Sequence, residues 1–345
     1  MIARRPLLAP AVRVALAGVF ATLGACGTRT GLYDSIGPTS QAGVDAAHPL
    51  ADCRAAPWLL FDVQDNQPNG VSTIHAMRAD GTQLHAVPLP HSPAYYPSVS
   101  PDGTKLLYTT SFVPTSDGGN DTALYLFDFA SQTALLVVSS FSMSYSALSP
   151  DLQTVAYSAN YGLYAIGADG TNNRSLVVGS PGNGAYGHPT FASDSKTILY
   201  GTLGVVGSVE SDGTNNQTLL TGVVGSFWYP NPAFSPDYSQ IAVGIFCDQT
   251  SPFDLLVFQY ASLAETACSS GTVLTTVSES SAENMGATDP SWGPTGLIAY
   301  GSYSDVWVIP ATGGTPTNVT SKLTGDAGAF TASDPVWAPA CAAVP

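Results

Sequence analysis

Pro97-Ser-Val-Ser-Pro-Asp-Gly-Thr-Lys-Leu-Leu-Tyr108 is the stretch of sequence that decides the fold. It predicts a short strand, a tight Pro-Asp-Gly turn and a second strand rich in leucine and tyrosine. Altered copies of this stretch recur along the chain, and their opening residues are Ser146, Pro189, Pro232, Pro290 and Pro335. Six copies of one unit indicate a repeat protein.

The spacing of the copies predicts the architecture. Successive copies begin 49, 43, 43, 58 and 45 residues apart, which is the length of a four-stranded propeller blade. One blade can be followed in full, with strands expected at 189–193, 197–201, 204–209 and 217–221. An Asp212-Gly213 pair separates the last two strands, and such a pair favours a hairpin because glycine accepts a positive φ.

The two ends of the repeat region complement one another. The last copy supplies only an inner strand, at 336–338, because the chain ends soon after it. The N-terminal part supplies three strands without an inner one, at 58–63, 72–78 and 84–88. Together they complete one blade, and a closed ring leaves no open sheet edge. We therefore predict an all-β, six-bladed β-propeller of four-stranded blades, closed by strands from both termini.

The repeat resembles a known family. A Pro-x-apolar-Ser-Pro-Asp-Gly turn, an Ile/Leu-Ala-Tyr strand and an Asp-Gly-Thr-Asn hairpin are similar to the WD-like repeat of TolB-type six-bladed propellers. The resemblance covers residues 58–339 and implies the fold rather than a function, since unrelated proteins share these repeats. TolB itself has an additional N-terminal domain that engages partners. We expect only a tether here, so the resemblance does not imply TolB's own role.

The N-terminus predicts export and lipid attachment. Arg4, Arg5 and Arg13 form a positively charged N-terminal region. The apolar run that follows is too short to stay across a bilayer. The run ends in Leu23-Gly24-Ala25-Cys26, which resembles a bacterial lipobox. We therefore expect a lipoprotein signal peptide at 1–25, a flexible tether at 26–52 that starts at lipidated Cys26, and the propeller at 53–345. An ordinary cleavable signal is the alternative, and the arginine pair is weakly similar to a twin-arginine signal.

Charge limits the partners. Without residues 1–25 the chain keeps 7 basic and 25 acidic residues, a formal charge of −18. Such a surface repels phosphate backbones, so we expect no nucleic-acid partner and membrane contact only through the lipid anchor. The alternative explanation of the acidic surface is solubility alone, because acidic surfaces are common in secreted proteins. The expected location is the bacterial cell envelope, in the outer membrane on its periplasmic side or surface, with the protein a monomer.

Motifs for chemistry are scarce. The sequence has no Gly-x-Ser-x-Gly, His-Glu-x-x-His, Cys-x-x-Cys or phosphate-loop motif. We therefore predict no catalytic residue, no metal and no cofactor. The aspartates that recur in the turns after the inner strands are expected to bind the backbone of their own turns; they are Asp102, Asp151, Asp194 and Asp237.

One side of the disc is expected to carry the binding surface. The turns after inner strands and the Asp-Gly hairpins share one side of a propeller, and they are short. Longer excursions, at 111–122, 248–253 and 270–289, fall on the other side together with the residues that precede the inner strands. Aromatic and polar side chains gather there, as in many binding proteins. The predicted ligand-binding residues are Tyr95, Tyr96, Tyr145, Tyr186, His188, Trp228, Tyr229, Asn231, Asp289 and Asp334. Packing of these aromatics as a plug is the alternative.

These features favour a non-enzymatic, lipid-anchored binding or scaffold module for a protein, peptide or glycan. The alternative is a lyase or hydrolase of the propeller type with a metal at the funnel mouth, where only His188, Asp289, Asp334 and His91 could meet. A purely structural surface lipoprotein is a third possibility.

Four cysteines follow the expected tether. Cys53 precedes the first strand and Cys341 follows the last inner strand, so ring closure would bring them to one turn. We predict the disulfides Cys53–Cys341 and Cys247–Cys268, with free thiols as the alternative.

Overall fold

The computed structural model describes residues 57–67, 70–114, 120–179, 187–222, 230–247, 254–263, 266–267, 270–276, 288–324, 330–339, 342 and 344. The chain divides into two compact units, Met1–His48 and Pro49–Pro345. All of the described residues belong to the second unit. None of its described helices is both long enough and apolar enough to span a bilayer.

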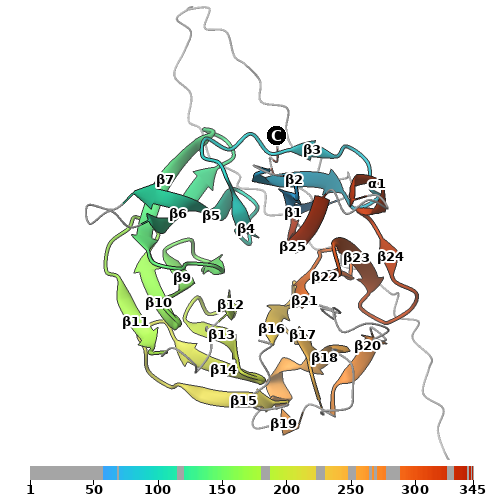
Figure 1. Cartoon of the computed structure of the whole chain (residues 1–345). Coiled ribbons are helices and arrows are strands. Elements are labelled where there is room, and N and C mark those ends of the chain that lie inside the picture. The colour runs from blue at the N-terminus through green and yellow to red at the C-terminus, as the bar shows by residue number, and fades with distance from the viewer. Residues whose placement is uncertain are drawn as a thin grey trace, which may run out of the picture. The chain divides into compact units, whose positions relative to one another are not determined.

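Six sheets form the blades of a ring around a central channel (Figure 1). From the channel outward, the strands of the first blade are β4 (Tyr95–Val99), β5 (Lys105–Pro114), β6 (Asn120–Asp128) and β7 (Thr133–Ser140). The second blade has β8 (Ser146–Leu148), β9 (Thr154–Ala159), β10 (Gly162–Gly167) and β11 (Arg174–Val177), and the third has β12 (Gly187–Phe191), β13 (Thr197–Thr202), β14 (Val205–Glu210) and β15 (Gln217–Thr221). The fourth blade has β16 (Asn231–Phe234), β17 (Gln240–Ile245), β18 (Asp254–Gln259) and β20 (Thr272–Thr276), and the fifth has β21 (Thr288–Trp292), β22 (Leu297–Ser302), β23 (Asp305–Pro310) and β24 (Thr317–Asn318).

The closing blade combines the two ends of the propeller sequence. Its inner strand is β25 (Phe330–Ala338), followed outward by β1 (Trp58–Asp65), β2 (Ser72–Arg78) and β3 (His85–Ala86). Strands β25 and β1 are antiparallel, with Trp58 opposite Ala338. The prediction of a six-bladed, four-stranded propeller closed by both termini is confirmed.

The short turns have the predicted conformations. Gly81, Gly170 and Gly213 have φ angles of 78°, 83° and 90° in the Asp-Gly hairpins. In the turns after the inner strands, Asp102 Oδ1 accepts hydrogen bonds from Ser100 Oγ at 2.6 Å and from the Thr104 amide at 3.0 Å. Asp151, Asp194 and Asp237 likewise accept amide hydrogen bonds from their own turns. These aspartates stabilise turns, as predicted.

The long connections differ from the prediction in two places. Strand β5 continues to Pro114 and strand β6 begins at Asn120, and these two residues pair. The expected excursion at 111–122 is therefore largely a lengthened hairpin. The outer strand β20 occupies part of the expected loop at 270–289. A two-residue strand, β19 (Thr266–Ala267), pairs in parallel with β15 of the preceding blade. The excursion at 248–253 lies outside the described residues.

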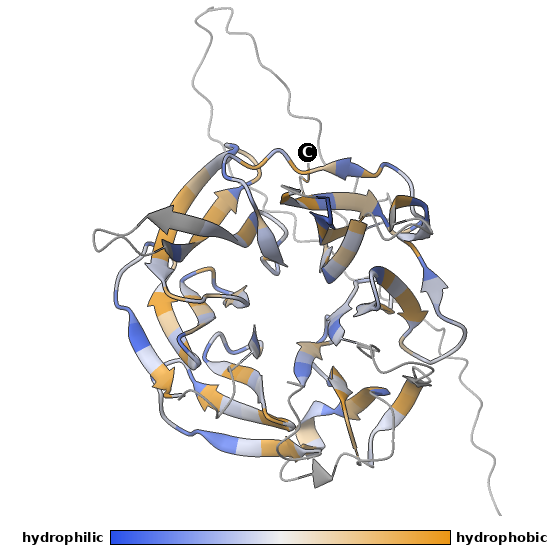
Figure 2. Cartoon of the chain, in the orientation of Figure 1, coloured by the Kyte–Doolittle hydropathy of each residue, from blue (hydrophilic) through white to orange (hydrophobic). Residues whose placement is uncertain are grey.

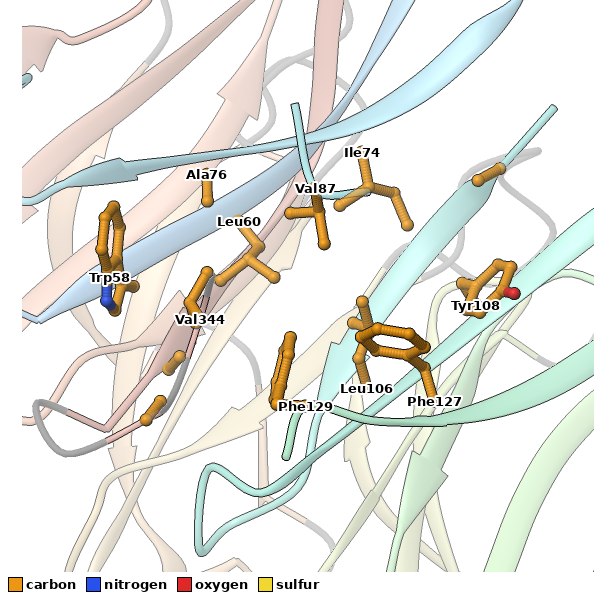
Figure 3. Close-up of a cluster of buried hydrophobic side chains, with 13 residues drawn as sticks. Trp58, Leu60, Ile74, Ala76, Val87, Leu106, Tyr108, Phe127, Phe129 and Val344 are labelled. Carbon is orange, nitrogen blue, oxygen red and sulfur yellow. The ribbon is translucent and has the colours of Figure 1, made fainter. Parts of the chain in front are cut away.

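Hydrophobic cores hold neighbouring blades together. Figure 3 shows the core between the closing blade and the first blade, where Leu60 and Ile74 meet Leu106 and Phe127. Strand β18 is buried at five consecutive positions, as expected for a strand covered on both faces. The orange stretches of strands such as β10 and β14 in Figure 2 mark this packing. Truncation of a fully buried aromatic such as Phe127 would cost about 3–5 kcal/mol.

Candidate functional site: the loop-side end of the central channel

The channel contains a cavity of about 550 Å³ lined by the inner strands of all six blades. Its volume lies within the range of small-molecule and cofactor sites. Tyr96, Tyr145, His188, Asp289 and Asp334 line the cavity on the side of the disc that carries the longer connections. We call this end of the central channel the channel end. One proline from each of five inner strands lines the wall: Pro97, Pro189, Pro232, Pro290 and Pro335.

Four inner strands carry the same irregularity at the channel end. In each, the residue before the proline and the proline itself form a bulge opposite a single residue of the next strand. The bulges are Tyr96-Pro97, His188-Pro189, Asp289-Pro290 and Asp334-Pro335. A bulge redirects a side chain relative to the regular pleat. The four redirected side chains all line the cavity.

The backbone at these bulges is strained. Tyr96, His188, Asp289 and Asp334 have φ angles between 50° and 53°, where residues other than glycine are uncommon. Each such residue costs on the order of 1–3 kcal/mol, and residues of this kind cluster at functional sites. The corresponding Asn231 is regular, since Asn231 and Pro232 pair normally with Gly244 and Val243.

A hydrogen-bonded group joins three blades at the channel end. His188 Nε2 lies 2.7 Å from Asp289 Oδ1, and Asn231 Nδ2 donates to the same oxygen at 2.6 Å. Gly201 helps to position Asn231, because a Cβ there would lie only 1.6 Å from the carbonyl oxygen of Pro230. The Asp289 carboxylate therefore receives donors from the third and fourth blades while belonging to the fifth.

Aromatic rings continue this group around the channel. The rings of Tyr145 and His188 have centroids 3.3 Å apart, and those of Tyr96 and Tyr145 are 4.7 Å apart. Tyr95 lies beside them, with its ring 6.1 Å from that of Tyr96. Burial, and then the nearby aspartates, raise the pKa of both Tyr96 and Tyr145, so both phenols remain neutral. These rings combine packing with partial exposure to the cavity.

A pair of carboxyl groups completes the site. Asp62, on β1, is buried and hydrogen-bonds to Asp334 on β25. Ser333 Oγ also donates to Asp62 Oδ1 at 2.7 Å. Burial raises the pKa of Asp62 to about 6, and burial together with the Asp62 and Asp289 charges raises the pKa of Asp334 well above its usual range. The two buried carboxyl groups therefore share a proton across their hydrogen bond.

Most of the predicted binding residues that are described meet here. Tyr96, Tyr145, His188, Asp289 and Asp334 line the cavity, Asn231 bonds to Asp289, and Tyr95 contacts Tyr96. Tyr186, Trp228 and Tyr229 lie outside the described residues, as does Cys26. Sequence reasoning missed Asp62, although one carboxylate inside the apolar run Trp58-Leu-Leu-Phe-Asp-Val63 was a signal.

The set of residues considered for a metal is only partly assembled. His91 Nδ1 lies 2.8 Å from the Tyr108 hydroxyl, and its ring stacks on that of Tyr125, with centroids 3.9 Å apart. His91 is therefore not among the residues that line the cavity with His188, Asp289 and Asp334. Within the described part of the chain, no three histidine, cysteine or carboxylate side chains are grouped as metal ligands would be.

The cysteine predictions rest mainly on residues outside the described part. Cys247 takes part in a disulfide, but the other four cysteines of the chain are not described. Trp58 and Ala338 pair at one end of the closing blade, whereas Cys53 and Cys341 lie outside the described residues. Both pairings stay predictions.

Comparison with solved structures identifies the fold. TolB from Acinetobacter baumannii superposes with a TM-score of 0.60 at 15% identity, over 82% of this chain and 67% of that one. This chain has a TolB-like propeller fold. The sequence matches no protein-family model, and it matches no curated protein.

Other propellers are also similar to this TolB-like chain. A chain of a nidogen/laminin complex superposes with a TM-score of 0.56 at 12% identity, over 81% of this chain and 98% of that one. The periplasmic gluconolactonase of Pseudomonas aeruginosa gives a TM-score of 0.50 at 12% identity, over 76% and 82% of the two chains. At these identities the similarity establishes the fold alone.

Proposed function

We propose that this protein is a non-enzymatic binding or scaffold module of the bacterial cell envelope, and that it holds a protein, peptide or glycan at the channel end. The observation that carries the proposal is the convergence of four strained bulges on one cavity. Backbone strain of this kind persists only where the surrounding structure maintains it. Tyr96 and Tyr145 offer large, rigid contact surfaces of the type that dominates binding energy.

The fold is consistent with this role. Two of the similar propellers are TolB from Acinetobacter baumannii and a chain of a nidogen/laminin complex. In the described part of the chain, the aspartates of the short turns on the opposite side of the disc are engaged by their own backbones. The bulged side chains, by contrast, line the cavity at the channel end.

Lipid attachment at Cys26 is part of the proposal. The lipobox-like Leu23-Gly24-Ala25-Cys26 would anchor the propeller through the tether at 26–52, with the outer membrane as the proposed location and a monomer as the proposed state. Cys26→Ser should move the protein from the membrane fraction to the soluble fraction of cells. Recovery of unchanged protein with an unmodified N-terminus beyond Cys26 would contradict lipid attachment.

An enzymatic role is the second candidate, favoured by the gluconolactonase among the similar structures. It would use the same cavity, where Asp289 and His188 form an acid–imidazole pair with Nε2 and Oδ1 2.7 Å apart. Turnover of lactones or glycans by purified protein, lost in His188→Gln, would favour this candidate over binding alone.

Affinity capture tests the binding role. The full chain, tagged and purified, is mixed with envelope extract, and bound material is compared between the wild type, Tyr145→Ala and Asp80→Asn. Asp80 lies in an exposed turn on the opposite side of the disc and serves as the control. We expect a partner that is retained by the wild type and Asp80→Asn and depleted by Tyr145→Ala. Equal retention by Tyr145→Ala would place the interaction elsewhere.

A further inference from the structure

The channel end has more hydrogen-bond acceptors than donors. Asn231 Nδ2 and His188 Nε2 are both directed at one oxygen, Asp289 Oδ1. No donor among the described residues reaches Asn231 Oδ1, although only 6% of Asn231 is exposed. A buried acceptor without a partner costs free energy. The amide oxygen of Asn231, next to the carboxylate that its nitrogen contacts, therefore has no donor among the described residues.

The titratable groups of the described lining, apart from tyrosine phenols, are two carboxyl groups and one imidazole. Asp289 and Asp334 line the cavity and Asp62 lies directly behind Asp334, whereas the described lining includes no lysine or arginine. Asp62, Asp289 and Asp334 all act electrostatically on Tyr96 and Tyr145, so the three carboxyl groups lie close to these rings. Buried carboxylates without a cation are costly. Here the cost is partly avoided by the proton that Asp334 shares with Asp62 and by His188, whose Nε2 lies 2.7 Å from Asp289 Oδ1.

The walls suit a cation as well. Tyr96 and Tyr145 present neutral aromatic rings beside the carboxyl groups. Aromatic faces attract guanidinium and ammonium groups, and this attraction strengthens where water is excluded. A cavity of about 550 Å³ has room for one side chain together with part of its backbone.

Building on the proposed binding role, we propose that the ligand inserts one cationic group with several N–H donors, a guanidinium or an ammonium, between Asp289 and Asp334 against the rings of Tyr96 and Tyr145. The cation donates to the carboxyl groups of Asp289 and Asp334, which line the cavity. It takes over the charge compensation that the shared proton provides, so that proton leaves Asp334 for the solvent. The ligand class is thus a basic peptide segment or a polyamine, and neutral glycans are disfavoured.

Small probes test the proposal on the full-length protein by isothermal titration calorimetry. N-acetyl-argininamide carries a guanidinium and no other charge, and N-acetyl-citrullinamide is its neutral isostere. We expect the wild type to prefer the arginine compound by about tenfold or more, which corresponds to loss of one charge-assisted hydrogen bond. Spermidine represents a polyamine, and stronger carboxylate-dependent binding of spermidine would support the same site with that source. Equal binding of the two amides, or no binding of any of the three probes, would overturn the proposal.

Matched variants locate the effect. Asp289→Asn and Asp334→Asn should each weaken the arginine probe about tenfold, whereas Asp80→Asn and Asp212→Asn, in exposed turns, should leave its affinity unchanged. All four variants replace one carboxyl group by an amide, so equal weakening by all four would show an effect that is not specific to the channel end and would overturn the site. The preference of the wild type for arginine over citrulline keeps the test valid if a channel variant fails to fold.

Proton release gives an independent readout. Titrations at pH 7 in phosphate and in Tris, buffers with different ionisation enthalpies, count the protons released on binding. We expect close to one proton for the wild type and none for Asp334→Asn, and no release from the wild type would contradict the exchange. If a captured partner depends on Tyr145 but the cationic probes do not bind, the binding role stands and only the cationic ligand class fails.

Discussion

The carboxyl groups of Asp62 and Asp334 hydrogen-bond to each other across the two strands that close the ring. One comes from the first strand in the sequence and the other from the last. Because β1 and β25 pair only in the closed propeller, this acidic pair exists only in the folded state. Ring closure thus builds part of the candidate site.

The Asp62–Asp334 pair should make stability depend on pH. Burial raises the pKa of Asp62 to about 6 in the folded protein, above the value of about 3.9 expected when unfolded. The folded state therefore binds the proton more tightly, so this contribution is complete below about pH 4 and is lost as the pH rises through 6.

Asp62→Asn removes this dependence. We expect its free energy of unfolding, relative to that of the wild type, to rise between pH 4.5 and pH 8 by about 2 kcal/mol. Urea denaturation at the two pH values measures the change. Aspartates with lowered pKa values, such as Asp102 and Asp237, affect both proteins equally. A difference that does not vary with pH would contradict the raised pKa of Asp62.

The strained bulges predict an unusual preference for glycine. His188 has a φ of 50°, which glycine adopts without the steric cost paid by alanine. His188→Gly should therefore be more stable than His188→Ala by about 1 kcal/mol in thermal or urea denaturation. The same pair of substitutions at Asn231, which has no positive φ, should favour alanine or show no difference. Equal stabilities at His188 would show that its backbone is not strained.

The Cys247–Cys268 disulfide should tie two blades together. Ala267, beside Cys268, pairs with Thr221 at the end of β15. The next residue, Gly222, packs so closely that a Cβ there would lie 2.4 Å from the carbonyl oxygen of Phe246, beside Cys247. Peptide mapping without reduction should recover Cys247 joined to Cys268, and Cys247→Ser should cost about 3 kcal/mol of stability. A peptide that joins Cys247 to Cys53 or Cys341 would refute both predicted pairings.

The repeat made the fold predictable. Pro97–Tyr108 and its copies predicted the strands and turns because each copy is a local unit. The two ends of the repeat region predicted ring closure because one supplies an inner strand and the other supplies the three remaining strands of the same blade. The position of Tyr96, His188, Asp289 and Asp334 before the inner-strand proline also predicted that they would share one end of the channel.

The details of the site depend on packing that the sequence does not encode locally. Asp62 belongs to a strand whose other residues form the core, and only the register of β1 against β25 brings it to Asp334. The bulges at His188 and Asp289 have no counterpart at Asn231, although all three residues precede a proline. Strand β19 joins the sheet of another blade, a long-range pairing that its two residues do not predict.

Site-specific photo-crosslinking tests the central claim, that the channel-end side of the disc is the binding face, most directly. Tyr303 is exposed in the turn between β22 and β23 on that side, outside the hydrogen-bonded group. Replacing Tyr303 with p-benzoylphenylalanine in the full-length protein, and irradiating intact cells, should give an adduct of discrete mass. The same crosslinker at Asp80, on the opposite side, should give none. An adduct from position 80 and none from position 303 would contradict the account.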